Sequence, residues 1–384
     1  MQKVAGIVAE YNPFHRGHAY HIAETRRLLG ADCAVVCVMS GDFVQRGDVA
    51  VFDKFARAEM AVRGGADLVF ELPLRWSLSP AETFAHGAVS LLESTGVVTH
   101  LSFGSECGDV NRLLAASEAQ HTPEFAQHLN FALASGVSYP RAQEMAARRA
   151  APEIAELLTQ PNDTLALQYL QALWAIESEM TPLAISRVGA GHDAAGESDY
   201  PSASRLRERL RSGERVTEWV PHLPEAQPVF LDDLEIAILS RLRMLPKEAF
   251  AALPCSSEGL ENVLYNAVHS AAAFDGILAA AKSKRYPMSR LRRMLLCAAL
   301  GVKKDAQAPY LRVLAANERG RALLHTMRET ATLPVITKPA AARQNAEFCL
   351  TAAAHDLYVL AQPDKTPGQD WRHTPMMLSS EIEL

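Results

Sequence analysis

Several features that define particular classes of protein are missing from this chain of 384 residues. Its six cysteines form no CxxC pair, so no zinc knuckle is present, and a disulfide scaffold is implausible at this length. No uninterrupted apolar run reaches the roughly 18 residues of a membrane-spanning helix, and no signal-peptide pattern precedes the first apolar run. We therefore expect a cytoplasmic protein with reduced thiols and no membrane partner.

An excess of positive charge is also missing. Lys and Arg number 38 against 44 Asp and Glu, which gives a formal net charge of -6. Any contact with nucleic acid therefore requires a local basic patch on an acidic body. Hydrophobic residues make up 48% of the chain and charged residues 21%, values that are typical of a globular protein and exclude global disorder.

Strand and helix patterns alternate in the N-terminal part of the chain. Short continuous apolar runs, typical of parallel strands buried on both faces, occur at residues 4–9, 33–39, 67–71 and 100–103. Helical spacing lies between them, at residues 17–29, 52–63 and 79–93. For the last helix we predict Ser79 as N-cap and Glu82 as its capping-box partner. The alternation predicts a doubly wound, Rossmann-like α/β domain.

The remainder of the chain has different patterns. Residues 109–180 are mostly helical and are predicted as a helical insertion into the α/β domain, followed by a returning strand near residues 183–188. The stretch 213–230 contains several Pro and Gly residues and is the best linker candidate. We therefore predict an α/β domain over residues 1–215 and a mostly α-helical domain, which lacks strand alternation, over residues 231–384. Its polar tail, from about Gln362, is expected to be loosely held.

The segment after the first predicted strand carries the most informative chemical pattern. Residues 6–18 have the sequence GIVAEYNPFHRGH, in which a strand ends in a turn and a helix begins near Gly17. A helix N-terminus at such a turn attracts anions, because its backbone N–H groups point outward. His15 and His18 are three residues apart, so both can lie on one side of the first helical turn. Two imidazoles there can stabilise the charge that develops during attack at phosphorus.

Two alternatives remain open for these histidines. A bare HxGH string arises by chance, so both rings can be ordinary histidines beside a strand. A zinc site that includes His21 is disfavoured, because the HExxH spacing and cysteine partners are absent.

In its position and residues, the HxGH segment resembles the signature of the nucleotidylyltransferase superfamily, whose Rossmann-like enzymes attack the α-phosphate of ATP and release pyrophosphate. A later signature of that superfamily, a Ser/Thr-rich helix start with an arginine, is similar to residues 202–207, SASRLR. Hydroxyls and a guanidinium at a helix start suit a departing pyrophosphate. Ser202, Ser204 and Arg207 are assigned to it on that basis, and an ordinary N-cap with surface arginines is the alternative.

Further blocks narrow the resemblance to the family of the tRNA(Met) cytidine acetate ligases. They are residues 10–15, 40–47, 53–58, 65–73, 102–106, 161–163, 186–192 and 282–286. The chain departs from the family pattern at Arg16, Asp42, Asp163 and His192. The resemblance implies that ATP activates acetate as acetyl-adenylate, with release of pyrophosphate. The acetyl group then passes to the wobble cytidine of elongator tRNA(Met), which gives N4-acetylcytidine and AMP.

The same resemblance implies the site residues. His15 and His18 are expected to be catalytic, and Mg2+ is expected to accompany ATP, although no dedicated metal ligands are identified. ATP contacts are expected at Ile7, Val8, Ala9, Glu10, Tyr11, Asn12, Pro13, Phe14, His15, Arg16, Gly17, His18, Ala19, Tyr20, Gly104, Asn162, Arg187 and Val188. Three of these have local alternatives: Gly104 as a turn glycine, Asn162 as the cap of a helix from residue 164, and Arg187 in an exposed ion pair.

Residues 282–293 reverse the acidic character of the chain. They contain no acidic residue, and the tRNA contacts are assigned to Lys282, Lys284, Arg285, Tyr286, Arg290, Arg292 and Arg293. Basic side chains with one stacking aromatic suit RNA phosphates and an unstacked base, and a charged helix surface is the alternative. Lys54 and Arg57 are predicted on a helix face, where they hold pyrophosphate or tRNA or are simply solvated.

The prediction is therefore an AMP-forming ligase that uses ATP, acetate and elongator tRNA(Met). One alternative is an adenylyltransferase that joins AMP to a small phosphorylated metabolite. Another is a non-catalytic, nucleotide-regulated RNA-binding protein. The residue patterns identify neither the general base of acetyl transfer nor an oligomeric state.

Overall fold

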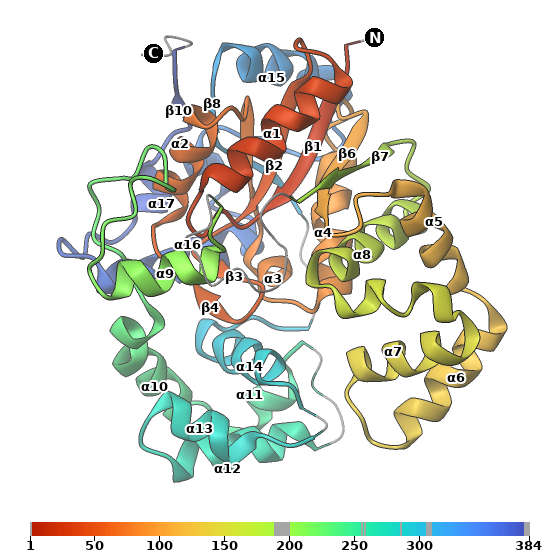
Figure 1. Cartoon of the computed structure of the whole chain (residues 1–384). Helices are drawn as coiled ribbons and strands as arrows, with labels where there is room; N and C mark the ends of the chain where they lie inside the picture. Colours follow the sequence, from red (N-terminus) through yellow and green to blue (C-terminus); the bar gives the residue numbers. More distant parts are fainter. Residues whose placement is uncertain are drawn as a thin grey trace.

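The computed structural model describes residues 2–187, 200–254, 256, 259–284, 286–304 and 309–379. An eight-stranded, mostly parallel sheet lies at its centre, with the order β10-β8-β5-β2-β1-β6-β7 and with β9 paired to β8 (Figure 1). The strands are β1 (Val4–Ala9), β2 (Ala34–Ser40), β5 (Leu68–Leu72), β6 (His100–Ser105), β7 (Thr181–Ser186), β8 (Leu311–Ala316), β9 (Val335–Ile336) and β10 (Met376–Met377). A separate hairpin consists of β3 (Phe43–Val44) and β4 (Asp48–Val49).

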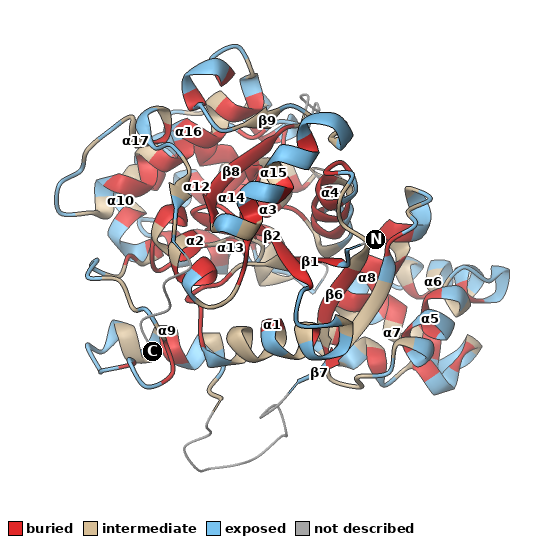
Figure 2. Ribbon diagram, turned by 90° about the horizontal axis from the view of Figure 1, so that it is seen from above, coloured by how far each residue is buried: buried red, intermediate tan, exposed pale blue. Residues whose placement is uncertain are grey.

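Strand β2 illustrates how the sequence forms this sheet, because all seven of its residues are buried. Ala34 and Val36 belong to a hydrophobic cluster with α4 and α15, whereas Val35 and Cys37 belong to another cluster with α1 and α2. These helices are α1 (Arg16–Leu29), α2 (Lys54–Arg63), α4 (Ala81–Glu93) and α15 (Glu318–Thr330). Successive side chains of a strand point to opposite faces, so a continuous apolar run needs cover on both. Figure 2 shows the buried strands between helices whose outer faces are exposed, which confirms the predicted doubly wound core.

The start of α4 differs from the prediction. The helix begins at Ala81 with Pro80 at the N-cap position and no side-chain cap. The hydroxyl of Ser79 instead donates to the carbonyl of Trp76 at 2.6 Å, in the short helix α3 (Leu74–Ser77). The predicted capping box is therefore wrong, because the preceding turn already uses the serine hydroxyl.

The chain segment that connects β6 to β7 is helical, as the predicted helical insertion requires. They are α5 (Val110–Ala119), α6 (Pro123–Ala134), α7 (Tyr139–Ala150), the 3-10 helices η1 (Pro152–Ile154) and η2 (Leu157–Thr159), and α8 (Pro161–Ala175). Helix α8 contacts both α4 and β6, so the insertion is attached to the sheet through this helix. The first turn of α8 is thereby held beside the carboxyl end of β6.

Residues 231–384 are mostly helical, as predicted, and α9 (Ala203–Arg211) precedes them within the range predicted as the α/β domain. Besides α15, the helices that follow α9 are η3 (Leu231–Leu234), α10 (Glu235–Arg243), α11 (Lys247–Ala251), α12 (Leu260–Ser270), α13 (Phe274–Ala281), α14 (Met288–Leu300), η4 (Pro339–Ala342), α16 (Ala346–Tyr358), η5 (Val359–Ala361) and α17 (Gln369–Arg372). A second large hydrophobic cluster joins α10 to α14 with part of α16. None of the helices in the described ranges is long and apolar enough to span a bilayer.

Residues 231–384, which show no strand alternation in the sequence, nevertheless contribute strands β8, β9 and β10. Strand β8 returns to the main sheet and pairs antiparallel with β5. All six of its residues are buried, including Arg312, whose charge interrupts the apolar run and hides the strand from a pattern search. The chain after the helical cluster therefore completes the α/β core.

The predicted loose tail is tied to the core by a buried group of charges. The ammonium group of Lys54 lies 2.7 Å from Glu71 Oε1 and 2.6 Å from Asp370 Oδ2, and Arg312 pairs with the same two carboxylates. All four side chains are at most 1% exposed. Burial lowers the pKa of Lys54, but the charges of Asp370 and Glu71 outweigh it and hold this pKa above its ordinary value. Lys54 is therefore a buried cation that joins α2, β5 and α17.

Arg57 is also buried, which contradicts its predicted place on an exposed or ligand-binding helix face. Its guanidinium donates to the carbonyls of Glu10 at 2.6 Å, Ser40 at 3.1 Å and Gly41 at 2.5 Å. These carbonyls follow directly after β1 and close β2. Arg57 thus holds the carboxyl ends of two neighbouring strands in a fixed relation, and neither it nor Lys54 is available to a ligand.

Replacing Lys54 by Met is expected to lower the free energy of unfolding by about 3–5 kcal/mol, because two buried carboxylates then share one guanidinium. Chemical denaturation followed by circular dichroism measures the change. Arg112→Met is the matched control, since it removes the cation of an exposed pair with Glu156 and should leave the midpoint within error. Equal destabilisation by both substitutions would contradict the importance of the buried cluster.

Candidate functional site

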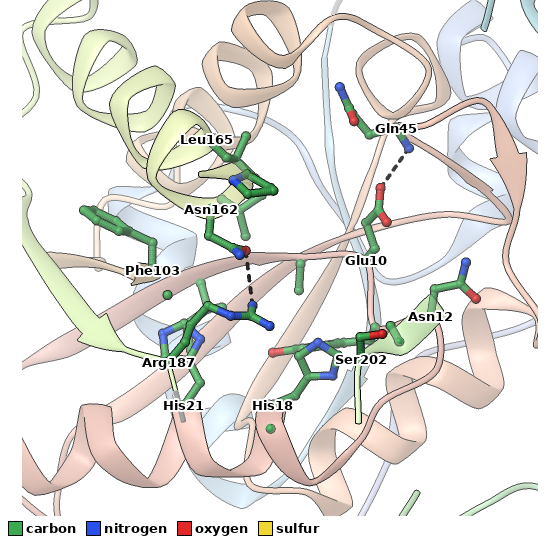
Figure 3. A pocket seen from close by; sticks show the side chains of 18 of the residues that line it. Glu10, Asn12, His18, His21, Gln45, Phe103, Asn162, Leu165, Arg187 and Ser202 are labelled. Atoms are coloured by element: carbon green, nitrogen blue, oxygen red, sulfur yellow. Dashed lines mark hydrogen bonds between the residues drawn. The ribbon is translucent and has the colours of Figure 1, made fainter. Parts of the chain in front are cut away.

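A cavity of about 490 Å3 lies at the carboxyl ends of β1, β6 and β7. Strand β1 pairs with β2 on one side and with β6 on the other, so the strand order reverses beside this cavity. Ligands of open α/β sheets bind at such a reversal. The first turn of α1, the start of α8 and the start of α9 complete the lining (Figure 3).

The two predicted catalytic histidines hold each other in place at the start of α1. His15 is the N-cap residue, and its Nδ1 accepts a hydrogen bond from the Gly17 N–H at 3.0 Å. The His15 N–H in turn donates to Nδ1 of His18 at 3.2 Å. The ring centroids are 3.8 Å apart in a stacked arrangement. Because each Nδ1 accepts a hydrogen bond, the proton of each neutral ring lies on Nε2.

The environment keeps these rings neutral. Burial, with a smaller contribution from the Arg187 charge, lowers the pKa of His15 to about 4. Burial lowers the pKa of His18 well below its ordinary value, and the His15, His21 and Arg187 charges add to this effect. At neutral pH the pair therefore offers two Nε2–H donors on neutral rings rather than two imidazolium charges.

Another side of the cavity is formed by β6, β7 and α8. Arg187 donates to Oδ1 of Asn162 at 3.2 Å, and the Asn162 amide donates to Oε1 of Glu106 at 2.5 Å. Helix α8 begins at Pro161 with no side-chain cap, so the alternative of Asn162 as a cap from residue 164 is wrong. Gly104 lies within β6 rather than in a turn, and an added Cβ would lie 3.6 Å from Arg187 Cγ.

Asp163 and Asp42, two of the residues at which the chain departs from the family pattern, have hydrogen-bond partners in this chain. Asp163 is 1% exposed and accepts hydrogen bonds from the Ser105 hydroxyl at 2.5 Å and from the Glu106 N–H at 2.9 Å. Asp42 accepts from the Lys54 N–H at 2.8 Å and pairs with His355 Nδ1 at 2.7 Å. The carboxylates of Asp163 and Asp42 are therefore each surrounded by hydrogen-bond donors of this chain. His192 lies outside the described residues.

The three residues predicted for pyrophosphate lie together at α9. Ser202 is the N-cap residue, and its hydroxyl accepts from the Arg205 N–H at 3.3 Å. Arg207 donates to the Asn12 carbonyl at 3.0 Å and to the Ser204 hydroxyl at 3.1 Å. Ser202 is thus a real cap, but Arg207 is not an ordinary surface arginine, because it reaches the turn after β1.

Most of the residues predicted to contact ATP line the cavity. They are Ile7, Val8, Ala9, Glu10, Tyr11, Asn12, His15, Gly17, His18, Tyr20, Gly104, Asn162 and Arg187. Pro13, Phe14, Arg16 and Ala19 are not among the lining residues, and Phe14 is fully buried in the core beneath α1. Val188 lies outside the described residues.

Sequence reasoning missed several lining residues. They include His21, Gln45, Arg46, Ala81, Phe84, Phe103, Thr164, Leu165, Tyr169 and Ile185. His21 is three residues beyond His18, so helical spacing places it on the same side of α1 and could have identified it. Gln45 and Arg46 lie in the block 40–47 that resembles the family, and that resemblance could have identified them. The apolar residues on α4 and α8 have no local pattern that distinguishes them from core positions.

The predicted tRNA contacts differ in how exposed they are. Lys282 and Lys284 are exposed before α14. Tyr286 is 8% exposed in the helical cluster and carries the Arg290 guanidinium 5.3 Å from its ring centroid, so its predicted role as a stacking platform is wrong. Arg293 donates to the Gln45 carbonyl at 3.1 Å, beside the cavity.

Arg285 and Arg292 are the other two predicted tRNA contacts. Arg285 lies outside the described residues. Arg292 is partly exposed, and its guanidinium lies 3.9 Å from Asp275. In the described part of the chain, no group of three or more His, Cys, Asp or Glu side chains is arranged to hold a metal ion.

Comparisons with known proteins identify the family of the chain. Residues 1–372 match the family model of the HIGH Nucleotidyl Transferases. The tRNA(Met) cytidine acetate ligase of Caldicellulosiruptor saccharolyticus is 37% identical over 349 residues, 85% of each chain. That of Clostridium perfringens is 31% identical over 400 residues, 97% of this chain and 99% of its own. A crystal structure of Thermotoga maritima TmcAL bound with alpha-thio ATP has a TM-score of 0.89 and 31% identity, covering 99% of this chain and 100% of its own.

The histidine geometry predicts a specific NMR result. At pH 6 the His15 and His18 rings should be neutral with the proton on Nε2, and His15 should protonate only near pH 4, because burial disfavours its cation. In the urea-unfolded chain the same ring should titrate near ~6.5. Since the unfolded chain then binds the proton more readily, stability should fall as the pH drops from ~6.5 toward 4. Long-range nitrogen–proton spectra test this, and a cationic ring or an Nδ1–H tautomer at pH 6 would contradict it.

Proposed function

Because the chain belongs to the HIGH nucleotidyl transferase family and, within it, to the tRNA(Met) cytidine acetate ligases, we propose that it acetylates the wobble cytidine of elongator tRNA(Met). The reaction uses acetate and ATP and yields N4-acetylcytidine, AMP and pyrophosphate. The observation that carries the proposal is the pair of Nε2–H donors of His15 and His18, fixed at a helix N-terminus in the cavity. ATP and tRNA, two of the three proposed substrates, are consistent with a cytoplasmic enzyme.

In the first step, an acetate oxygen attacks the α-phosphorus of ATP and pyrophosphate leaves. His15 and His18 donate hydrogen bonds to the α-phosphate oxygens, where negative charge increases in the transition state. The N–H groups at the start of α1 add their partial positive charge. Neutral donors suit this step, because they are already oriented and need not lose a proton.

The departing pyrophosphate is assigned to the start of α9. Ser202, Ser204 and Arg207 line the cavity there, and Arg207 is anchored to the turn after β1. We propose that Mg2+ would accompany ATP, held by phosphate oxygens and water as is usual for this ion. When bound with ATP in this way, Mg2+ would neutralise charge on the β- and γ-phosphates.

The adenosine is assigned to the opposite side, where Phe103, Gly104, Asn162 and Arg187 line the cavity. A small residue at Gly104 leaves room for the base or ribose beside the aliphatic part of Arg187. Asn162 is oriented by Glu106 and Arg187, so its amide is fixed before a ligand arrives.

The tRNA is assigned to the basic start of α14 and the segment before it. Lys282, Lys284 and Arg292 provide positive charge on a net acidic protein. In the second step the N4 amine of the cytidine attacks the acetyl carbonyl, which requires a base extruded from its stack. We propose the helical cluster of α10 to α14 as the tRNA-binding part.

The activity test combines ATP, labelled acetate and bulk tRNA and measures labelled N4-acetylcytidine, free AMP and pyrophosphate. His18→Ala is expected to slow acetate-dependent pyrophosphate release about 10²–10³-fold, because one transition-state donor is removed. His325→Ala on the exposed face of α15 is the matched control and should keep the wild-type rate. AMP retained covalently in a product would instead favour an adenylyltransferase.

The exposed lysines provide the test of tRNA binding. Replacing Lys282 and Lys284 by Ala should weaken tRNA affinity and flatten its dependence on log salt by about 0.7–0.9 for each phosphate that is no longer neutralised, while ATP affinity stays unchanged. The matched double variant replaces Lys303 and Lys304, which are exposed beyond the other end of α14, about 20 Å away at 1.5 Å per residue. Filter binding at several salt concentrations measures both. The same salt slope for wild type and the Lys282/Lys284 variant would refute the assignment.

A further inference from the structure

A single carboxylate faces the cavity among its described lining residues, and it belongs to Glu10. Glu10 follows directly after β1, and its backbone carbonyl is held by Arg57 at 2.6 Å. Its Oε1 accepts the Gln45 N–H at 2.8 Å, and within the described chain Oε2 has no hydrogen-bond partner. The carboxylate is therefore fixed through one oxygen, and the other can accept a proton.

The surroundings of Glu10 are distinct from the side assigned to adenosine. In Figure 3 the Glu10 carboxylate points toward Gln45, whereas Phe103, Asn162, His21 and Arg187 lie together on the other side of the view. The Gln45 amide donates to the Ser79 carbonyl at 3.4 Å, which connects this wall to the start of α4. Phe84 and Tyr169, both largely buried, also line the cavity. The lining near Glu10 also includes Arg46 and Arg207, whose charges act on its carboxylate, so this end of the cavity combines aromatic rings that can stack on a base with cations that attract a phosphate.

The same wall contacts the helix proposed to bind tRNA. Arg293 of α14 donates to the Gln45 carbonyl at 3.1 Å. The backbone at Gly47 lies so close to α14 that an added Cβ would lie 2.6 Å from the Arg293 nitrogen. The Glu10 end of the cavity is therefore joined to α14 through Gln45.

The histidines of the cavity are poorly suited to act as a general base that accepts a proton. His15 and His18 use Nδ1 as the acceptor of a backbone N–H, and burial lowers the pKa of each. The imidazole of His21 is hydrogen-bonded to the Ser102 hydroxyl at 2.9 Å. Burial raises the pKa of Glu10 despite the Gln45 N–H and the nearby Arg207 and Arg46 charges, so this carboxylate is a stronger base than an exposed one.

We propose that Glu10 is the general base of acetyl transfer and marks the subsite for the cytosine amine, an assignment that rests on the proposed function. The N4 nitrogen forms a bond to the acetyl carbonyl carbon of acetyl-adenylate. Its proton passes to Oε2 of Glu10, the bond from the carbonyl carbon to the phosphate oxygen breaks, and AMP leaves. The protonated carboxyl then returns its proton to water. Glu10 thus contacts the acceptor rather than ATP.

The experiment separates the two half-reactions. Glu10→Gln keeps an oxygen that can accept the Gln45 N–H but cannot take a proton. Single-turnover transfer from preformed acetyl-adenylate to tRNA should fall about 10²–10⁴-fold, whereas acetate-dependent exchange of pyrophosphate into ATP should change much less. Glu153→Gln, an exposed glutamate on η1, is the matched control for both rates.

Each outcome has a clear meaning. Equal loss of exchange and transfer in a folded Glu10→Gln variant, or no loss of transfer, would overturn the proposal. If that variant does not fold, the wild-type pH profile decides: transfer should fall as the pH drops through the pKa of Glu10 while exchange does not, and parallel profiles would overturn the proposal. Absence of acetate-dependent exchange in the wild-type protein would instead refute the proposed function itself.

Discussion

The hydrogen bonds from the Gly17 N–H to His15 Nδ1 and from the His15 N–H to His18 Nδ1 are the constraint on which the site depends. Each Nδ1 satisfies a backbone N–H that a helix start would otherwise leave without a partner. The same bonds determine which nitrogen carries the proton and aim both donors from one helix turn. The bonds that cap the helix thus also orient the two Nε2–H donors proposed to bind phosphate, so a change that disturbs the helix start also disturbs the donors.

The loop between β3 and β4 connects this site to the helical part of the molecule. It binds Glu10 through the Gln45 N–H and binds α14 through the Gln45 carbonyl. The backbone N–H of Gln45 therefore contacts a residue of the cavity, and the backbone carbonyl of the same residue contacts the basic helix. In the proposed function, the tRNA on the helix and the base in the cavity would meet at this loop, and Arg57 holds the strand ends behind it.

The sequence predicted those parts of the fold that depend on local pattern. Continuous apolar runs located β1, β2, β5 and β6, and the HxGH spacing located the start of α1, because each depends on residues close together in the chain. The buried places of Lys54 and Tyr286 were missed, since only distant partners such as Asp370 decide whether a charged or aromatic side chain is exposed. Strand β8 was missed for the same reason: Arg312 is acceptable inside a sheet only because Glu71 and Asp370 neutralise it. In the site, the residues after β1 were predicted, whereas Phe84 and Tyr169 enter the cavity through tertiary packing alone.

The buried position of Asp370 has a consequence for how the chain reaches this state during synthesis. Lys54 and Asp370 are separated by 316 positions, yet each neutralises the other inside the core. When a ribosome has produced only the first half of the polypeptide, the ammonium group on α2 still lacks one of its two carboxylates, and β5 lacks its neighbour β8. The nucleotide-binding half therefore cannot mature as an independent unit ahead of the rest, and its final packing has to wait until almost the entire polypeptide has emerged.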